Sequence, residues 1–378
     1  MCVQWARSAR AAYGRPPSYA EASRASSRMS RLPWQSAAGR ARIILFGLSG
    51  LLAFAPRSTS AIEVAAGLRV EVVAVGIPRP TQLALGPRGH LVVLSLGARG
   101  DAAAEIYRID PQQRIPVDGT WLPHVVVPFP QDSRKTVFGS LAIDPRSGDL
   151  FLGEENGNRI YRLGVDHRLQ ALVIGLDHLL GGSSLTLDRK GRLVFLDYAS
   201  PETHLRSEIP VPPSLSALIE DGYLGPLVYR IDPREDRPLP RRADLLAPIF
   251  PRGAAPSARS EPLWRFIGVA AMGDDLVFLT SVGEVLRLGA DGVLRLLTRL
   301  PGGHYHRTNL TPHPDGSVLV CGGFQIRQIF RITPGGVVTT IASELGDPGG
   351  IAVDGAGVLY VPETALHRII RIVPASAR

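Results

Sequence analysis

Four acidic residues stand just where short apolar runs of the chain end: Glu154, Glu155, Asp197 and Glu363. Two carboxylates held close together can bind a cation, or can act as the acid and the base of one reaction. Arginines follow two of these positions, since Arg159 comes shortly after Glu154 and Arg368 shortly after Glu363. Buried acids are usually paired with a cation, so ion pairing within the fold is the alternative interpretation.

Two histidines and an asparagine lie close together in the segment GGHYHRTN, at His304, His306 and Asn309. Alternate residues of a strand point to the same side, so the two imidazoles could converge. Two imidazoles with a carboxylate from elsewhere in the fold would suit a transition metal. The spacing fixes no third ligand, and ordinary surface histidines are the alternative.

The elements that must position these residues come from one repeated pattern of apolar run, tight turn and apolar run. Six copies begin at Thr81, Gly139, Ser183, Ile267, Thr308 and Gly349. A third apolar run follows, as in EIYRID and RIYRLG, and most copies have a fourth. Short runs rich in Val, Ile and Leu between Gly, Asp and Pro turns are typical of strands, and the repeats lack helical spacing.

Units of four antiparallel strands cannot bury both of their faces alone, so they must pack against one another. A radial stack of such units is a β-propeller, whose circular arrangement hides the sheet edges. We therefore predict an all-β protein, a six-bladed β-propeller of four-stranded antiparallel blades, with seven blades as the alternative. The last copy lacks a fourth run, and Leu68–Ile77 matches that pattern. The N-terminal strand should therefore complete the last blade beside Arg368–Val373 and close the ring.

Aspartates recur in the turns of this pattern, at Asp144, Asp188, Asp315 and Asp354. An Asp side chain can accept hydrogen bonds from the backbone of its own turn, and a following Gly supplies a positive φ. We therefore predict that these four acids form turns rather than take part in chemistry.

Charge is distributed unevenly along the 378 residues, whose formal net charge is +8. Residues 1–61 hold nine arginines and a single acid, Glu21, which leaves 33 basic and 33 acidic residues in 62–378. A phosphate-binding surface needs a surplus of cations on the folded part, so nucleic acid is not an expected partner. Cys321 is the only cysteine in 62–378 and is expected to be a small buried residue.

The basic N-terminal segment ends in an apolar stretch of 13 residues, Ile43–Ala55, and then in small polar residues up to Ala61. That stretch is short for a membrane span and typical of the core of a signal peptide. We predict a leader at 1–61 with cleavage near Ala61, export to the periplasm or the extracellular space, and no transmembrane segment in the mature chain. An organelle transit peptide is the alternative, because 1–42 is rich in Arg, Ser and Ala. The remainder, 62–378, is expected to be a single domain with an insertion at 198–226.

The segments GEENGNRIYRL (153–163) and PETALHRIIRI (362–372) resemble a phrase of NHL repeats, in which an acidic residue precedes Asn, Arg and Ile on the way into the third strand. The pattern over 66–374 resembles NHL-repeat propellers and the senescence-marker-protein/gluconolactonase-like group of six-bladed propellers. The resemblance is specific for the fold. It says little of the activity, because propellers host unrelated functions.

For the gluconolactonase-like enzymes, the resemblance implies a divalent cation, usually calcium, held in the central channel by Glu, Asn and Asp where the innermost strands begin. The corresponding positions here are Gln82, Ser140, Ser184, Gly268, Asn309 and Gly350. Only Asn309 matches the family pattern, and none of these positions is acidic. Calcium takes roughly six to eight oxygen ligands that include carboxylates, so the candidate cation ligands are Asn309, Glu154 and Asp197.

Two functions are compatible with these features. The first is a propeller that binds a small molecule or a protein partner on its channel face. The candidate residues for that face are Gln82, Ser140, Glu154, Glu155, Ser184, Asp197, His306, Asn309 and Glu363. The second is a lactonase-like hydrolase that uses calcium or another divalent cation in the channel. The uncharged ring and the balanced charge favour the binding protein, and a monomer is expected.

Overall fold

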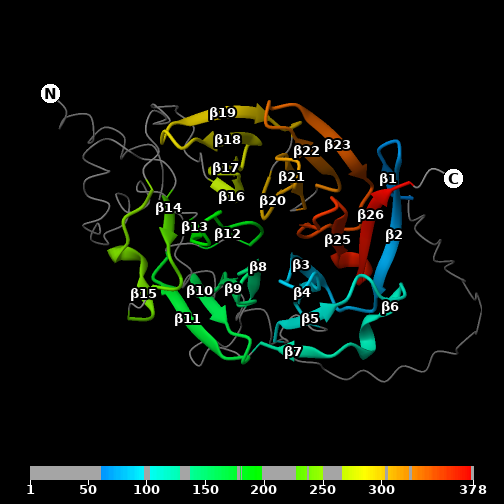
Figure 1. Cartoon of the computed structure of the whole chain (residues 1–378), viewed down its shortest axis with the longest axis horizontal. Coiled ribbons are helices and arrows are strands. Elements are labelled where there is room, and N and C mark those ends of the chain that lie inside the picture. The colour runs from blue at the N-terminus through cyan, green and yellow to red at the C-terminus, as the bar shows by residue number, and fades with distance from the viewer. Residues whose placement is uncertain are drawn as a thin grey trace, which may run out of the picture. The chain divides into compact units, whose positions relative to one another are not determined.

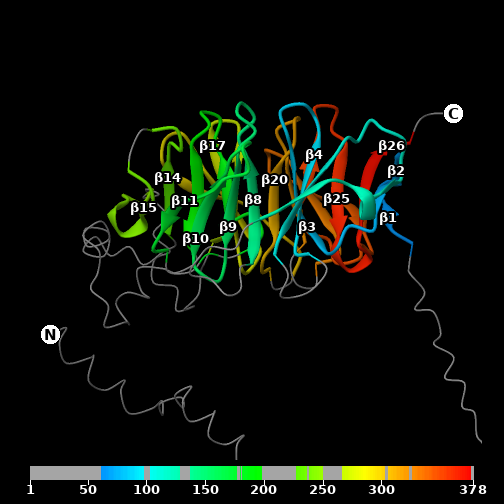
Figure 2. The ribbon, with the colours of Figure 1, turned by 90° about the horizontal axis from the view of Figure 1, so that it is seen from below.

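A computed structural model describes residues 61–97, 103–127, 137–176, 179, 181–197, 227–235, 238–249, 266–302, 305–322 and 326–375. In these ranges the chain is all β: its strands form six small sheets, and its helical residues belong to short 3-10 turns. Figure 1 shows the sheets side by side around a centre in chain order, and Figure 2 shows their strands running between two faces. The described residues therefore form a six-bladed β-propeller, as predicted, and they contain no seventh blade.

Each blade places its first strand near the centre and its later strands outward, and we number the blades 1 to 6 in the following order (Figure 1). Blade 1 contains β3 (Pro80–Leu85), β4 (Leu91–Ser95), β5 (Glu105–Ile109) and β7 (His124–Val126). Blade 2 contains β8 (Phe138–Ile143), β9 (Leu150–Glu154), β10 (Arg159–Leu163) and β11 (Leu169–Ile174). Blade 3 contains β12 (Leu185–Leu187), β13 (Leu193–Asp197) and β14 (Leu227–Ile231). Blade 4 contains β16 (Phe266–Met272), β17 (Asp275–Thr280), β18 (Glu284–Leu288) and β19 (Leu294–Arg299). Blade 5 contains β20 (Asn309–Pro312), β21 (Val318–Cys321), β22 (Ile329–Ile332) and β23 (Val338–Ser343). Blade 6 contains β24 (Ala352–Val353), β25 (Leu359–Glu363), β26 (Arg368–Pro374) and β2 (Leu68–Val75). Blade 3 departs from the four-stranded prediction, because in the described ranges its fourth position is a single bridge between Tyr229 and Pro248.

The hydrophobic core is divided among the spaces between neighbouring blades. In β4, Leu94 packs in a cluster with Leu152 of blade 2, whereas Val93 packs in another cluster with Tyr360 of blade 6. Successive side chains of a strand point to opposite faces of the sheet. Both faces of each blade are therefore buried, which explains why the strands read as continuous apolar runs. Cys321 is buried in the cluster between blades 5 and 6, as expected.

The turns between the first two strands of a blade are built as predicted. The carboxylate of Asp354 accepts hydrogen bonds from the backbone N–H groups of Ala356 and Val358, both at 2.9 Å. Equivalent side-chain bonds close the turns at Asp144, Asp188 and Asp315. A glycine with positive φ follows in each case, at Gly148, Gly191, Gly316 and Gly357. These acids are committed to local structure.

The N-terminal strand β2 pairs antiparallel with β26, the last strand of the chain. Leu68 lies opposite Pro374 and Val75 lies opposite Arg368, so the two segments expected to be partners are neighbours in one sheet. β2 is not the outer edge of that sheet, because β6 (Val117–Asp118) adds beyond it in parallel. Segments from both ends of the described chain thus share blade 6.

Three blades carry a fifth strand that the repeat pattern did not predict. β6, from blade 1, runs parallel to β2, and β15 (Arg241–Arg242), which follows β14, runs parallel to β11 of blade 2. β1 (Glu63–Val64) adds to β23 of blade 5. The 3-10 turns η4 (Gly119–Trp121) and η5 (Ala243–Leu245) follow β6 and β15, and η6 (Thr364–Leu366) follows β25. The short crossing strands cover sheet edges and join blades.

No helix in the described ranges is long and apolar enough to cross a membrane. Residues 1–60 of the predicted leader, the predicted insertion at 198–226 and His304 lie outside the described residues.

Candidate functional site

A hollow of about 190 Å³ lies at the centre of the face where the innermost strands begin and the second strands end. We term this the loop face and the cavity the channel hollow. Five of the six blades contribute to its lining. Its polar side chains with titratable or amide groups are Gln82, Glu155, Arg307, Asn309 and Asp347, and its glycines are Gly139, Gly181, Gly182 and Gly349. The hollow therefore gathers residues that are far apart in the sequence.

Two side-chain amides that line the channel hollow have hydrogen-bonding groups to which no described residue is bonded. Asn309, at the start of β20, is 3% exposed; its Oδ1 accepts a hydrogen bond from Ser183 Oγ at 3.3 Å. Its Nδ2 has no partner among the described residues. Gln82, in β3, is 7% exposed, and no described residue bonds its amide. A buried donor without an acceptor costs about 1–3 kcal/mol, so these amides are suited to bonding a ligand.

One ion pair spans the channel hollow, between Glu155 of blade 2 and Arg307 of blade 5. Glu155 follows β9, and Arg307 precedes β20 with a positive φ of 55°. The carboxylate is tightly packed, because a Cβ added to Gly139 or Gly181 would lie 1.9 or 2.2 Å from its Oε1. Burial raises the pKa of Glu155, and the charge of Arg307 opposes that rise. The pair brings no net charge to the hollow.

Gly181 and Gly182 of blade 3 line the hollow, and the segment 181–184 that contains them is bonded to blades 2 and 5. Gly182 N donates a hydrogen bond to the carbonyl oxygen of Gly139 in blade 2 at 2.9 Å. Ser183 Oγ accepts one from Leu310 N in blade 5 at 2.6 Å. This segment therefore narrows the centre of the ring on the loop face.

The predicted ring positions differ in whether their side chains line the hollow. Ser184 Oγ donates a hydrogen bond to Ser140 Oγ at 2.9 Å, and both serines are buried outside the lining. A Cβ added to Gly350 would lie 2.6 Å from Gln82 Oε1, so the glycine leaves room for that amide. Gln82 and Asn309 are the ring positions that line the hollow.

Two of the predicted carboxylates are bonded within their own blades and do not line the hollow. Glu154 accepts hydrogen bonds from Gly157 N at 2.8 and 2.9 Å, and it lies opposite Arg159 in the pairing of β9 with β10. Glu363, which is 0% exposed, forms an ion pair with Arg368 at 2.5 Å. The geometry of Glu363 matches the ion-pairing interpretation, and the carboxylate of Glu154 is held by the backbone of its own turn.

Two further candidates also lie outside the lining of the hollow. Asp197, at the end of β13, is 3% exposed, and His306 is half-buried just before Arg307. Neither residue is free of interactions. The histidine pair of the sequence cannot be compared with the hollow, since His304 lies outside the described residues.

Arg307 and Asp347 line the hollow and were not among the predicted site residues. A signal for Arg307 existed, because it stands two residues before Asn309 in the phrase HRTN. Asp347 lies in the loop between β23 and β24, and partial burial raises its pKa. Nothing in the repeat pattern points to that loop.

Calcium, which the family resemblance implies, does not fit the side chains of this hollow. In the described ranges, no three His, Cys, Asp or Glu side chains lie together as a metal site requires. The hollow contains the guanidinium of Arg307, and the carboxylate of Glu155 is bonded to it. A calcium ion needs several free oxygens that include carboxylates. Of the predicted ligands Asn309, Glu154 and Asp197, only Asn309 lines the hollow.

No protein-family profile and no curated protein sequence matches this chain. Among solved structures, a gluconolactonase from Xanthomonas campestris is 16% identical with a TM-score of 0.53, and the match covers 82% of this chain and 90% of that one. A carbohydrate-active enzyme from Trichoderma reesei is 10% identical, with a TM-score of 0.53 and coverages of 83% and 97%. The PQQ domain of a pyranose dehydrogenase from Coprinopsis cinerea is 11% identical, with a TM-score of 0.52 and coverages of 82% and 97%. Identities this low are informative about the fold alone. The chain therefore shares the six-bladed β-propeller fold of gluconolactonase-like proteins.

Proposed function

We propose that this protein binds a small, uncharged, polyhydroxylated molecule in the channel hollow. The observation that carries the proposal is Asn309, which lines the hollow and whose buried Nδ2 is bonded by no described residue. The nearby amide of Gln82 offers a donor and an acceptor as well. Hydroxyl groups both donate and accept, so a polyol can satisfy amides that the fold leaves open.

The electrostatics of the hollow favour a ligand without net charge. Glu155 and Arg307 neutralise one another across the cavity. Asp347 adds a further carboxylate to the lining, and partial desolvation raises its pKa. An anionic ligand would lose hydration without gaining a free cation, because Arg307 is bonded to Glu155.

The dimensions of the hollow favour a single small ring. Its volume of about 190 Å³ is below the roughly 300–1,000 Å³ of pockets for drug-sized ligands. Glycines at several points of the wall let a ligand approach the backbone closely. A monosaccharide or its lactone fits this description better than an oligosaccharide does.

Calorimetric titration with D-glucose, myo-inositol and D-glucono-1,5-lactone tests the proposal, with D-gluconate as the anionic comparison. We expect at least one neutral probe to bind saturably and gluconate to bind more weakly. Asn309→Leu and Gln82→Leu should each weaken binding by about tenfold, since a hydrogen bond is worth about 1–1.5 kcal/mol. Gln113→Leu replaces an exposed amide outside the hollow and should leave the affinity unchanged.

The proposed ligand class would be wrong if no neutral probe bound, or if both amide variants bound as the wild type does. Ring opening of the lactone, followed by proton release in the same samples, separates binding from catalysis. Turnover above the spontaneous rate that is lost in Asn309→Leu would make the hollow a catalytic site as well.

We propose further that the protein is exported and cleaved near Ala61. The support is the order of a basic segment, the apolar stretch Ile43–Ala55 and small residues before the cleavage point. β1 begins at Glu63, so this cleavage would leave every described strand in the mature protein. N-terminal sequencing of the protein from periplasm or medium should give Ile62 as the first residue; an uncleaved N-terminal segment in every fraction would contradict the proposal.

A further inference from the structure

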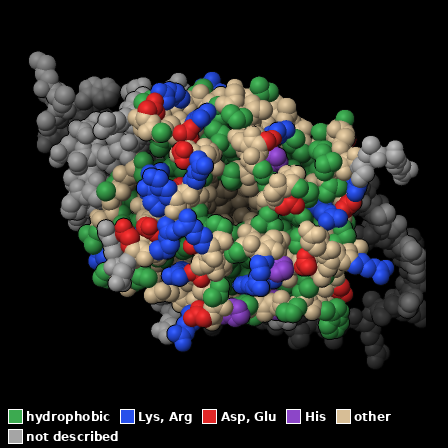
Figure 3. All heavy atoms as spheres, in the orientation of Figure 1, with side chains coloured by type: hydrophobic (Ala, Val, Ile, Leu, Met, Phe, Trp, Pro, Cys, Tyr) green, Lys and Arg blue, Asp and Glu red, His purple; other side chains and the backbone are tan. Residues whose placement is uncertain are grey.

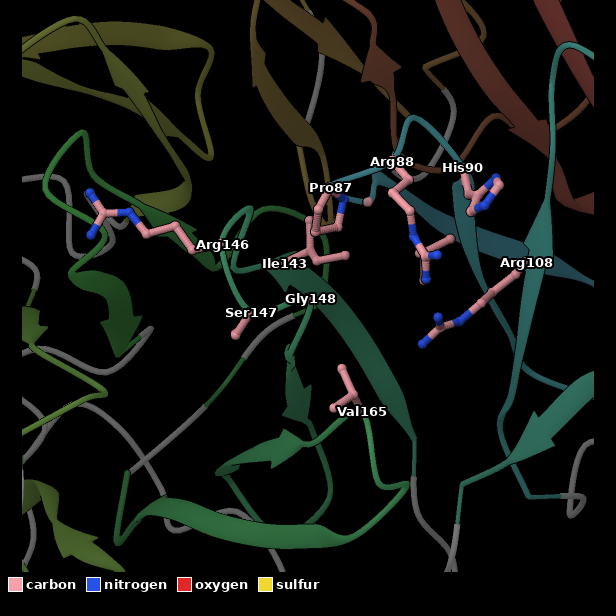
Figure 4. A pocket seen from close by; sticks show the side chains of 11 residues that line it. Pro87, Arg88, His90, Arg108, Ile143, Arg146, Ser147, Gly148 and Val165 are labelled. Carbon is pink, nitrogen blue, oxygen red and sulfur yellow. The ribbon is translucent and has the colours of Figure 1, made fainter.

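A second hollow, of about 240 Å³, lies on the opposite face of the propeller, between blades 1 and 2. We term this the turn face, because the turns from β3 to β4 and from β8 to β9 lie there. The side chains that define this turn-face hollow are Arg88, Arg108, Ile143, Ser147 and Val165, together with the neighbouring Arg146. Figure 4 shows that they come from turns and strands of both blades.

The arginines of this hollow are exceptional in having no partner. Elsewhere arginines are bonded, as Arg162 is to Asp149 and Arg192 is to Asp188. Within the described ranges, the arginines whose side chains bond neither a carboxylate nor another oxygen are Arg88, Arg108, Arg114 and Arg146. All of these except Arg114 line the turn-face hollow. Arginine keeps its charge at any physiological pH, so the hollow presents uncompensated positive charge.

Two of these guanidinium groups occupy the same side of the hollow. Figure 4 shows Arg88, from the turn after β3, and Arg108, from β5, extending into one space, whereas Arg146 points away from them. Guanidinium groups bind carboxylates with two parallel, charge-assisted hydrogen bonds each. The pair is therefore placed to hold one anionic group between its members.

The rest of the hollow is apolar. Val92 and Ile143 form its inner part, and Val165 lies at its rim with 61% of its surface exposed. An exposed valine beside two guanidinium groups suits a ligand that has an apolar body as well as a negative charge. A bare inorganic anion would leave this apolar surface in water.

The surroundings of the hollow do not supply the missing negative charge. Figure 3 shows that Lys and Arg side chains gather mainly on one side of the central opening. The first turns of blades 1 to 3 carry Arg88, Arg146, Arg189, Lys190 and Arg192 against Asp144, Asp149 and Asp188, whereas those of blades 4 to 6 carry Asp274, Asp315 and Asp354 and no Lys or Arg. Of the acids in blade 2, Asp149 is paired with Arg162 and Asp166 with Arg168, while Asp144 accepts a hydrogen bond from the backbone N–H of Arg146. This charge distribution attracts anions toward blades 1 and 2.

We propose that the turn-face hollow binds a small organic anion, a carboxylate or sulfonate attached to a compact apolar body. The anionic group lies between Arg88 and Arg108, and the body rests on Ile143 and Val165. This site is independent of the channel hollow, because it lies on the other face and shares no residue with it.

Benzoate is the probe for the test, with benzyl alcohol as its uncharged analogue and inorganic phosphate as an anion without an apolar body. Ligand-observed NMR titrations should give saturable binding of benzoate at one site and at least fivefold weaker binding of either comparison. The double variant Arg88→Gln, Arg108→Gln should weaken benzoate binding at least tenfold. Arg114→Gln removes an equally unpaired charge outside the hollow, so it should change the affinity less than twofold.

Two further measurements separate the parts of the proposal. Val165→Ser should weaken benzoate several-fold and leave phosphate unchanged. Raising the salt concentration should weaken benzoate binding to the unmodified protein, because screening reduces the attraction of exposed charges. The proposal is overturned if benzoate does not bind saturably, or if benzoate and phosphate bind with equal affinity. It is also overturned if Arg114→Gln weakens benzoate binding as much as the double variant does, or if the affinity for benzoate does not change with salt concentration.

Discussion

The two hollows of this propeller use charge in opposite ways. On the loop face, Arg307 is paired with Glu155 across the channel hollow, and Arg368 is paired with Glu363 nearby. On the turn face, Arg88 and Arg108 have no acidic partner in the described ranges. One face is formed by strand ends enclosed between neighbouring blades, and the other is formed by turns in contact with water.

Burial explains this difference. A buried charge must be paired, because removing it from water costs several kcal/mol. An exposed guanidinium keeps its hydration and can remain unpaired at little cost. Acids that look catalytic in the sequence are therefore held in structural bonds, as Glu363 is, whereas surface arginines remain available for a ligand.

The largest expected effect comes from breaking a buried pair on the loop face. Glu363→Ala leaves Arg368 and the backbone N–H of Gly346 without their acceptor. We expect the free energy of unfolding to fall by about 3 kcal/mol, measured by urea denaturation. Arg295→Ala removes half of the exposed pair between Asp291 and Arg295, leaves the turn of Asp291 intact and should leave the urea midpoint unchanged. Equal decreases in the free energy of unfolding in the two variants would contradict the difference in charge pairing between the two faces.

A smaller loss should follow from adding one methyl group to the wall of the channel hollow. A Cβ on Gly349 would lie 2.0 Å from the carbonyl oxygen of Thr81, so the backbone must move. We expect Gly349→Ala to lower the free energy of unfolding by about 1–3 kcal/mol. Gly355, in a turn of the opposite face, has open space around its added Cβ. Gly355→Ala should change stability by less than about 0.5 kcal/mol, and a larger loss there than at Gly349 would contradict the packing described.

The free energy of unfolding should depend on pH through Glu155, the paired acid of the channel hollow. Burial raises the pKa of Glu155, so the folded state binds this proton more tightly than the unfolded state does. The resulting loss of folding stability is absent at pH values below the pKa of Glu155 in the unfolded state, and it is complete above the pKa in the folded state. Compared with Glu155→Gln, the wild type should therefore lose stability as the pH rises from about 4 toward neutrality. Urea midpoints at several pH values measure this, and a flat or opposite trend would contradict the raised pKa.

The smallest effect is expected on the turn face. The double variant Arg88→Gln, Arg108→Gln removes no ion pair, so the free energy of unfolding should stay within about 0.5 kcal/mol of the wild type. At low salt the variant should gain slightly, because repulsion between the two cations is removed. A loss of stability would mean that these arginines are structural like the charges of the loop face.

The fold could be predicted because the second strand of each blade is buried on two sides. Leu94 and Val93 face different neighbours, so both had to be apolar, and that requirement produced the repeated runs. The turns at Asp144 and Asp354 were predictable because their hydrogen bonds are local. The crossing strands β6 and β15 were not, because two residues leave no apolar run to recognise.

The site could be predicted only where it depends on position within a blade. Gln82, Glu155 and Asn309 were expected near the channel, and they line the hollow. Arg307 and Asp347 reach it through loop conformations and contacts between distant blades, which a repeat pattern does not encode. The turn-face hollow was missed because its arginines are ordinary surface residues until the absence of partners is known.

The most direct test follows backbone amide resonances of glycines in ¹⁵N-labelled, deuterated protein during two separate titrations. One titration uses the neutral sugar probe that binds best, and the other uses benzoate. We predict that the sugar shifts Gly139, Gly181 and Gly349, while benzoate shifts Gly86 and Gly148. Movement of one common set by both probes, or movement of neither set, would contradict two hollows that differ in charge.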